Sequence, residues 1–223
     1  YCGESAHSFQ YRDLAVEKYR RDDEWLRGKR GFEIVTASRV VGAVGRLQSR
    51  KLFAHLGSLR GKPPAEWSLL PGFLISVSEV AAEAGLSEVA VAPVLEAFAL
   101  PESERNASFE SLQDYNVTNA TPLLPAGAGV YLLFQIYSLA EALYEGPFYW
   151  MGADKAYKVT ALDHRGAFTE QVAYDFLRRV FGAAHVFLMN WRRGIRILVT
   201  LEPVRCRHRR SLCRRFADRE RIS

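Results

Sequence analysis

The arginines near the C-terminal end are the residues whose type and density most directly suggest a chemistry. From Arg192 onward there are eleven arginines and three acidic residues, whereas the whole chain has 30 basic and 25 acidic residues. Removing this segment leaves 19 basic and 22 acidic residues in 1–191, a net charge of −3. Clustered guanidinium groups can bind nucleic-acid phosphates. The alternative is an arm in solvent, and we expect residues 204–223 to form a disordered basic tail.

The cysteines do not form a recognisable metal or disulfide pattern. Cys2, Cys206 and Cys213 are odd in number and match neither a zinc motif nor a disulfide framework, which favours a reducing compartment. No apolar run approaches the ~20 residues that a membrane span needs. The chain opens on Tyr1 without a charged and apolar leader. We therefore expect a fragment of a cytoplasmic protein that has no membrane partner.

Hydrophobic periodicity predicts a mainly α fold with a helical domain over residues 1–160. One surface helix with a single apolar stripe is predicted over 12–27, and a second helix over 34–56. Gly42 and Gly45 weaken the middle of the second helix. The segment 57–64 then ends it, and 101–125 is predicted to be a long polar connection.

Residues 75–98 resemble a helix-turn-helix unit. Ser78 is predicted to cap the first helix, Gly85 to supply a left-handed turn residue and Ser87 to cap the second helix. Small residues at this turn allow two helices to cross closely. The second helix carries Glu88 and no basic residue where a reader of DNA would need one. We therefore favour a packing or partner module over direct readout of bases.

A strongly apolar helix is predicted over 130–144, ending at Gly146 and Pro147. An aromatic cluster follows, with Asp154 and Lys155 beside it. It could stack on nucleic-acid bases, but large aromatics more often form an internal hydrophobic plug, which we favour. Its members are Tyr144, Phe148, Tyr149, Trp150 and Tyr157.

The last apolar segment, 164–191, carries a resemblance to a known family. A helix opening at Gly166 and Thr169 and closing at Gly182 is followed by a strand over 185–189. Arg165, Gly166, Glu170, the helix end at 180–182 and the aromatic strand resemble the start of the nuclease-related domain, a member of the PD-(D/E)xK superfamily. Upstream, 116–122 and 144–157 resemble the helical region that precedes this domain in certain uncharacterised bacterial proteins.

The resemblance implies a partial restriction-endonuclease-like α/β unit over 161–203, whose strand at Phe187 lacks neighbours. Glu170 would be the catalytic and metal-binding carboxylate, and the family cofactor would be Mg²⁺. Arg165, Arg192 and Arg193 are the candidate nucleic-acid-binding residues, with DNA as the partner. The family would also need a strand carrying a second acidic residue and a lysine on a third strand.

Residues 204–215 stand where the family places its acidic strand, yet they have no strand pattern. We predict that the reading frame is lost between residues 190 and 205, and that the chain binds no Mg²⁺ and is inactive. The resemblance thus predicts an inactive fragment of a metal-dependent phosphodiesterase, an endonuclease. The alternative is a non-enzymatic module in which the helical domain binds nucleic acid or a protein partner.

Overall fold

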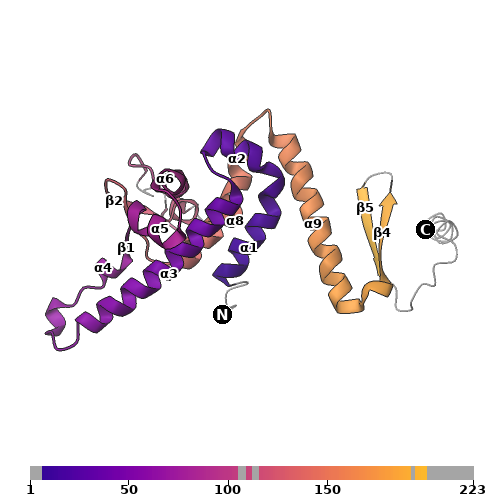
Figure 1. Cartoon of the computed structure of the whole chain (residues 1–223). Helices are drawn as coiled ribbons and strands as arrows, with labels where there is room; N and C mark the ends of the chain where they lie inside the picture. The colour runs from indigo at the N-terminus through magenta and orange to yellow at the C-terminus, as the bar shows by residue number, and fades with distance from the viewer. Residues whose placement is uncertain (1–6, 105–108, 112–115, 192–193, 200–223) are drawn as a thin grey trace. The chain divides into compact units, whose positions relative to one another are not determined.

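The computed structural model describes residues 7–104, 109–111, 116–191 and 194–199. The described chain is mainly helical, which confirms the predicted fold class (Figure 1). Packing divides it into unit 1, residues 1–165, and unit 2, residues 166–223. Within the described ranges, none of the helices combines the length and the apolar character needed to cross a membrane. The basic tail lies outside the described residues, as do 192–193 and 200–205 of the segment in which the reading frame is predicted to be lost.

Unit 1 consists of helices and one small sheet. Its helices are α1 (Ser8–Tyr19), α2 (Asp23–Arg30), α3 (Ile34–Ser58), α4 (Leu70–Phe73), α5 (Val77–Ala84), α6 (Glu88–Ala97), α7 (Val117–Ala120), α8 (Ile136–Ala153) and the first residues of α9 (Lys158–Phe181). The 3₁₀ turns are η1 (Arg20–Asp22) and η2 (Pro64–Glu66), and the strands are β1 (Leu74–Ser76), β2 (Leu124–Gly127) and β3 (Val130–Leu132).

Helix α3 is the longest helix and the centre of the packing in unit 1. It contacts α1, α5, α6 and α8. Its buried residues recur at the spacing of one helical face and are Ile34, Ala37, Val40, Val41, Ala43, Val44, Leu47 and Gln48. Gly42 and Gly45 lie within the helix without interrupting it. The helix predicted over 34–56 is confirmed.

The N-terminal segment is broken where a single helix was predicted. The 3₁₀ turn η1 separates α1 from α2, so the helix expected over 12–27 is two helices. The break turns Asp22 inward, where it is fully buried. A charge pattern alone does not locate such a break, because Asp22 and Asp23 look equivalent in the sequence.

Helices α5 and α6 form the pair that residues 75–98 predict. Gly85 adopts the left-handed conformation, with φ of 61°, and Ser87 caps α6 by accepting from the Ala90 N–H. The cap of α5 is Ser76 and not Ser78. Ser76 Oγ accepts from the backbone of Glu79, whose carboxylate accepts in return from the Ser76 N–H, forming a capping box.

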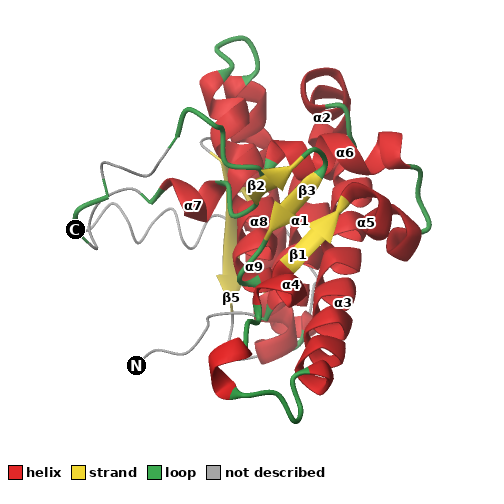
Figure 2. Ribbon diagram, turned by 90° about the vertical axis from the view of Figure 1, so that its left-hand side faces the viewer, coloured by secondary structure: helices red, strands yellow, loops and turns green. Residues whose placement is uncertain are grey.

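A three-stranded antiparallel sheet follows the order β1-β3-β2 (Figure 2). β1 precedes α5 directly, and it pairs with β3 from Leu74 opposite Leu132 to Ser76 opposite Val130. β2 and β3 form a hairpin after α6. The helix predicted over 130–144 is therefore wrong at its start, because Val130–Leu132 is a strand. A continuous apolar run does not distinguish a buried strand from a buried helix.

Helix α8 continues through Gly146 and Pro147, where it was predicted to end. Pro147 occupies the helix interior, a position that disturbs the local hydrogen bonds. The Tyr19 hydroxyl fills the gap: it donates to the Tyr144 carbonyl at 2.7 Å and accepts from the Phe148 N–H at 3.2 Å. A side chain from α1 thus replaces a helical hydrogen bond of α8, and α1 packs along α8.

Unit 2 contains the remainder of α9 and a two-stranded antiparallel sheet. α9 begins at Lys158, so the predicted start at Gly166 or Thr169 is wrong, while its end before Gly182 is confirmed. β4 (Val186–Trp191) pairs with β5 (Gly194–Val199), with Phe187 opposite Leu198. The strand at Phe187 therefore has a neighbour, contrary to expectation. The predicted apolar face of α9 is partly exposed, with Phe176 64% accessible.

Candidate interaction surface

Cationic side chains of α3 hold α5 in place. Arg46 and Arg50 bind Glu83 at 2.8 and 2.6 Å, and Lys51 binds Glu79 at 2.7 Å. Hydrogen bonds from Arg50 and then Arg46 lower the pKa of the Glu83 carboxyl. These three cations therefore have acidic partners within unit 1.

The C-terminal end of α5 is also bound by α3. Arg39 Nε donates to the Ala84 carbonyl at 2.8 Å, and Nη2 donates to the Gly85 carbonyl at 3.3 Å. Carbonyls at a helix C-terminus lack helical partners and attract cations. Arg39 thus stabilises the turn between α5 and α6 and uses its donors there.

Helix α6 differs because its charged residues face solvent. Val91, Val94 and Leu95 are buried, as predicted. Glu88 and Glu96 are exposed, and Val89 beside them is 84% accessible. In the part of the chain that the structure describes, neither glutamate side chain makes a hydrogen bond or an ion pair. Pro93 has no N–H, so the Val89 carbonyl lacks its usual donor four residues ahead.

The β2–β3 hairpin adds a second exposed element without charge. Its tip consists of small or apolar residues, all exposed: Pro125, Ala126, Gly127, Ala128 and Gly129. The end of α6 is tied to the chain just before β2, because the Leu123 N–H donates to the Phe98 carbonyl at 3.1 Å and the Leu100 N–H donates to the Leu123 carbonyl at 2.8 Å. We call the exposed residues of α6, Glu88, Val89 and Glu96, the α6 surface.

A buried polar joint connects the N-terminal helices to the start of α9. Asp22 accepts from Tyr157 Oη at 2.9 Å and contacts His164 Nδ1 at 2.7 Å, while Arg165 Nη2 donates to its second oxygen. The Arg165 guanidinium also lies 4.4 Å from the centroid of the Tyr19 ring. A buried carboxylate requires such partners, because its desolvation is otherwise costly.

The surroundings of the joint shift the protonation of neighbouring groups. Burial, reinforced by the hydrogen bond to Asp22, raises the pKa of Tyr157 to about 12. Burial lowers the pKa of Lys18 to about 8, although Glu145 opposes this shift. Lys18 Nζ lies 3.7 Å from the centroid of the Tyr144 ring and donates to the Tyr144 carbonyl at 3.0 Å. We assign these groups a structural role, because they join α1, α8 and α9.

Most of the aromatic cluster packs inside unit 1. Tyr144, Phe148, Trp150 and Tyr157 are partly buried against the core. Trp25 stacks on Tyr157 with the ring centroids 5.7 Å apart. These contacts favour the hydrophobic plug over a stack of nucleic-acid bases, because protein groups already cover the rings.

Two of the predicted site residues, Glu170 and Arg165, lie among the residues that the structure describes. Glu170 lies half-buried within α9 in unit 2, far from the first helical turn in which it was expected. Arg165 is 8% accessible and binds Asp22, so we do not include it in any nucleic-acid surface. Arg192 and Arg193 lie outside the described residues. Among the residues described, no three His, Cys, Asp or Glu side chains form a metal-binding group.

Sequence reasoning missed Asp22, a fully buried carboxylate that binds three side chains. Its partners are 135, 142 and 143 residues away in the chain. A local pattern carries no signal of contacts at that separation. Comparisons with protein-family models, with curated proteins and with solved structures gave no match to this chain.

Proposed function

We propose that this chain is a non-enzymatic interaction module whose α6 surface binds a protein partner. In this proposal α3, β1, α5, α6 and the β2–β3 hairpin act as a helix-turn-helix unit with a wing. The order of these elements and the strand order β1-β3-β2 support this assignment, since they are those of a winged helix. The partner presents an apolar side chain together with basic ones.

The observation that carries the proposal is the distribution of charge around α5 and α6. The cations near the turn bind acceptors on α5, whereas α6 presents Glu88 and Glu96 to solvent together with the exposed Val89. DNA binding depends on neutralising phosphates with Lys and Arg. An acidic helix with an exposed apolar residue fits a basic protein surface better.

A charge-reversal experiment tests which class of partner the α6 surface fits. Duplex DNA binding of the full chain is measured by fluorescence anisotropy across a salt series. Glu88→Lys/Glu96→Lys is compared with Glu66→Lys/Glu102→Lys, which adds the same charge at two exposed sites elsewhere. We expect equal effects from the two variants. A salt slope steeper by about 1–2 in the α6 variant alone would place α6 against DNA and contradict the proposal.

A second candidate function concerns unit 2 and follows the resemblance of its sequence to the nuclease-related domain. A helix carrying Glu170 that leads into a strand supports it. We propose that this unit is the inactive start of a nuclease-related domain, because the described chain supplies only one of the required groups. The test is a cleavage assay on DNA with Mg²⁺. The expected result is no cleavage, and robust cleavage that is lost in Glu170→Ala would contradict it.

A further inference from the structure

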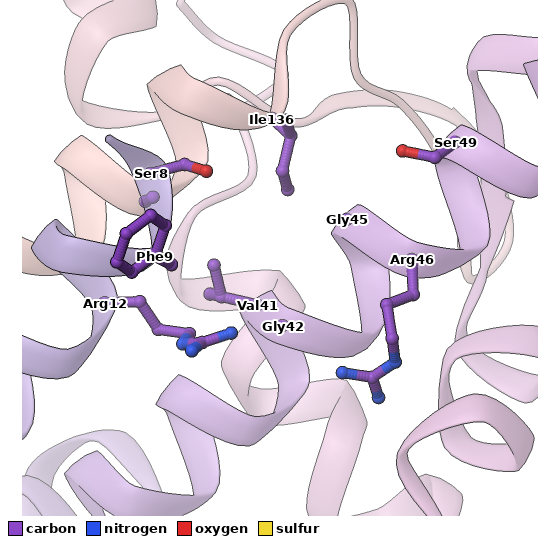
Figure 3. Close-up of a pocket in the computed structure, with 10 residues that line it drawn as sticks. Ser8, Phe9, Arg12, Val41, Gly42, Gly45, Arg46, Ser49 and Ile136 are labelled. Carbon is purple, nitrogen blue, oxygen red and sulfur yellow. The ribbon is translucent and has the colours of Figure 1, made fainter.

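A pocket of about 490 Å³ lies between α1, α3 and α8, and shares Arg46 with the ion pairs between α3 and α5. Its size is within the range of small-molecule sites. Its lining combines the guanidinium groups of Arg12 and Arg46, the hydroxyl groups of Ser8 and Ser49, and an apolar wall that includes Phe9 and Ile136 (Figure 3).

Two guanidinium groups converge on Gly42. A Cβ atom at Gly42 would lie 2.9 Å from Arg12 Nη1 and 3.6 Å from Arg46 Nη1. The missing side chain therefore leaves a space that both nitrogens border, and Figure 3 shows the two arginines flanking Gly42. Both nitrogens thus lie near one point beside Gly42, so that a single phosphate or carboxylate group that packs against Gly42 can accept from both arginines.

Both Nη1 atoms keep their hydrogens available. Arg12 uses Nε and Nη2 to bind Asp13, and Arg46 uses Nε and Nη2 to bind Glu83 and its carbonyl. Among the described residues, neither Nη1 donates to an acceptor. The other donors hold each guanidinium in place, so the free edge is pre-oriented for a ligand.

The charge at this site is net positive. Glu83 is shared between Arg46 and Arg50, so three guanidinium groups face two carboxylates, those of Asp13 and Glu83. An oxyanion would neutralise the remaining charge through charge-assisted hydrogen bonds.

The lining also has an apolar part, which favours contact with an apolar group of the ligand. Val41, Ile136 and Ala140 form an aliphatic wall, and Phe9 adds an aromatic ring that is 53% accessible. A bare inorganic ion would leave this wall in water. We propose that the pocket binds a small organic anion, in which a phosphate or carboxylate group lies at Gly42 and an apolar body contacts Phe9 and Ile136.

Gly42→Ala is the sharpest test, because the added methyl group fills the space between the guanidinium groups. The contact at 2.9 Å is to the flexible end of Arg12, and alanine favours a helix, so the fold should persist. Gly57→Ala is the matched control: Gly57 lies in the same helix, and a Cβ there would meet no atom within 4 Å.

Binding of phenyl phosphate, benzoate and inorganic phosphate to the full chain is measured by isothermal titration calorimetry. We expect saturable 1:1 binding of phenyl phosphate or benzoate, at least tenfold weaker binding of inorganic phosphate, and an affinity reduced at least tenfold in Gly42→Ala but unchanged in Gly57→Ala. The preferred probe distinguishes a phosphate from a carboxylate ligand. Arg46→Met should weaken binding similarly.

Three outcomes would overturn the proposal. The first is an absence of saturable binding of every probe up to ~10 mM. The second is equal binding by Gly42→Ala and the original chain, with circular dichroism showing that both are folded. The third is inorganic phosphate binding as tightly as phenyl phosphate, which would remove the role of the apolar wall.

Discussion

Helices α5 and α6 are neighbours of similar length, yet their charged residues differ in whether they have partners within the protein. The acids of α5, Glu79 and Glu83, bind cations of α3, whereas Glu88 and Glu96 of α6 face solvent. Charge on α5 therefore stabilises the fold, and charge on α6 is free for a partner. The net charge of the chain, +5, does not reveal this division. The comparison predicts that substituting a charged residue with partners inside unit 1 lowers the stability of the fold strongly. Substituting a charged residue of the α6 surface should change the stability little.

The largest expected effect on stability is that of substituting Asp22, a fully buried charge whose partners all lie within the protein. Asp22→Asn should lower the free energy of unfolding by about 3–5 kcal/mol, because it leaves Arg165 with less compensation in a buried site. Urea denaturation measures this loss. Asp13→Asn is the control, since its pair with Arg12 is exposed and should contribute less than about 1 kcal/mol.

A double variant sharpens the same point. Asp22→Asn combined with Arg165→Met removes both charges, so much of the stability should return. Equal losses in Asp22→Asn and Asp13→Asn would contradict the distinction between buried and exposed charge in unit 1.

The next effect concerns Lys18 and depends on pH. Burial lowers the pKa of Lys18 from 10.5 to about 8, so between these pH values the unfolded chain binds more protons than the folded chain. Its contribution to stability should therefore be fully present above pH 10.5 and lost as pH falls through 8. After allowance for solvent screening, we expect this contribution to the free energy of unfolding to be about 1–2 kcal/mol.

Lys18→Met provides the comparison for this pH dependence. The free energy of unfolding of the original chain, minus that of the variant, should increase from pH 8 to pH 10. The subtraction cancels the other titrating groups, including Tyr157. A difference that stays flat or decreases over this range would contradict the assigned burial of Lys18.

The smallest expected effects are on the Tm, and they come from matched substitutions in α5 and α6. Glu83→Gln removes the negative charge that Arg46 and Arg50 share and should lower the Tm by roughly 2 °C at low salt, with less effect at high salt. Glu88→Gln should leave the Tm within about 1 °C, because Glu88 binds nothing in the described chain. Differential scanning calorimetry measures both, and equal shifts would remove the division between the two helices.

Local chemistry allowed some elements to be predicted from the sequence. Gly85 and Ser87 carry conformational and capping preferences that act within a few residues, and both were placed correctly. Two serines near the start of α5 could each cap it, and the choice of Ser76 depends on the strand that precedes it. The strand at Val130 was not predicted. An apolar run fits a strand or a helix, and only the pairing with β1 and β2 makes this one a strand.

The pocket and the polar joint depend on tertiary contacts that no local pattern encodes. Arg12 and Arg46 converge only when α1 packs against α3. From the sequence alone, Gly42 only lowers the helix propensity of its segment, and its position beside the two arginines is known only from the structure. The predicted sites at Glu170 and Arg165 depended on a family resemblance. The structure instead uses Arg165 as a buried partner of Asp22.

The most direct test of the α6 surface is site-specific photo-crosslinking. A p-benzoylphenylalanine replaces Val89 in the full chain, expressed in the cells from which it derives. Val159, which is 69% accessible, is the control position. We predict one discrete protein adduct from position 89 that is lost in the Glu88→Lys/Glu96→Lys background and absent from position 159. Adducts with DNA, or the same adduct from both positions, would contradict the assignment of α6 as a protein-binding surface.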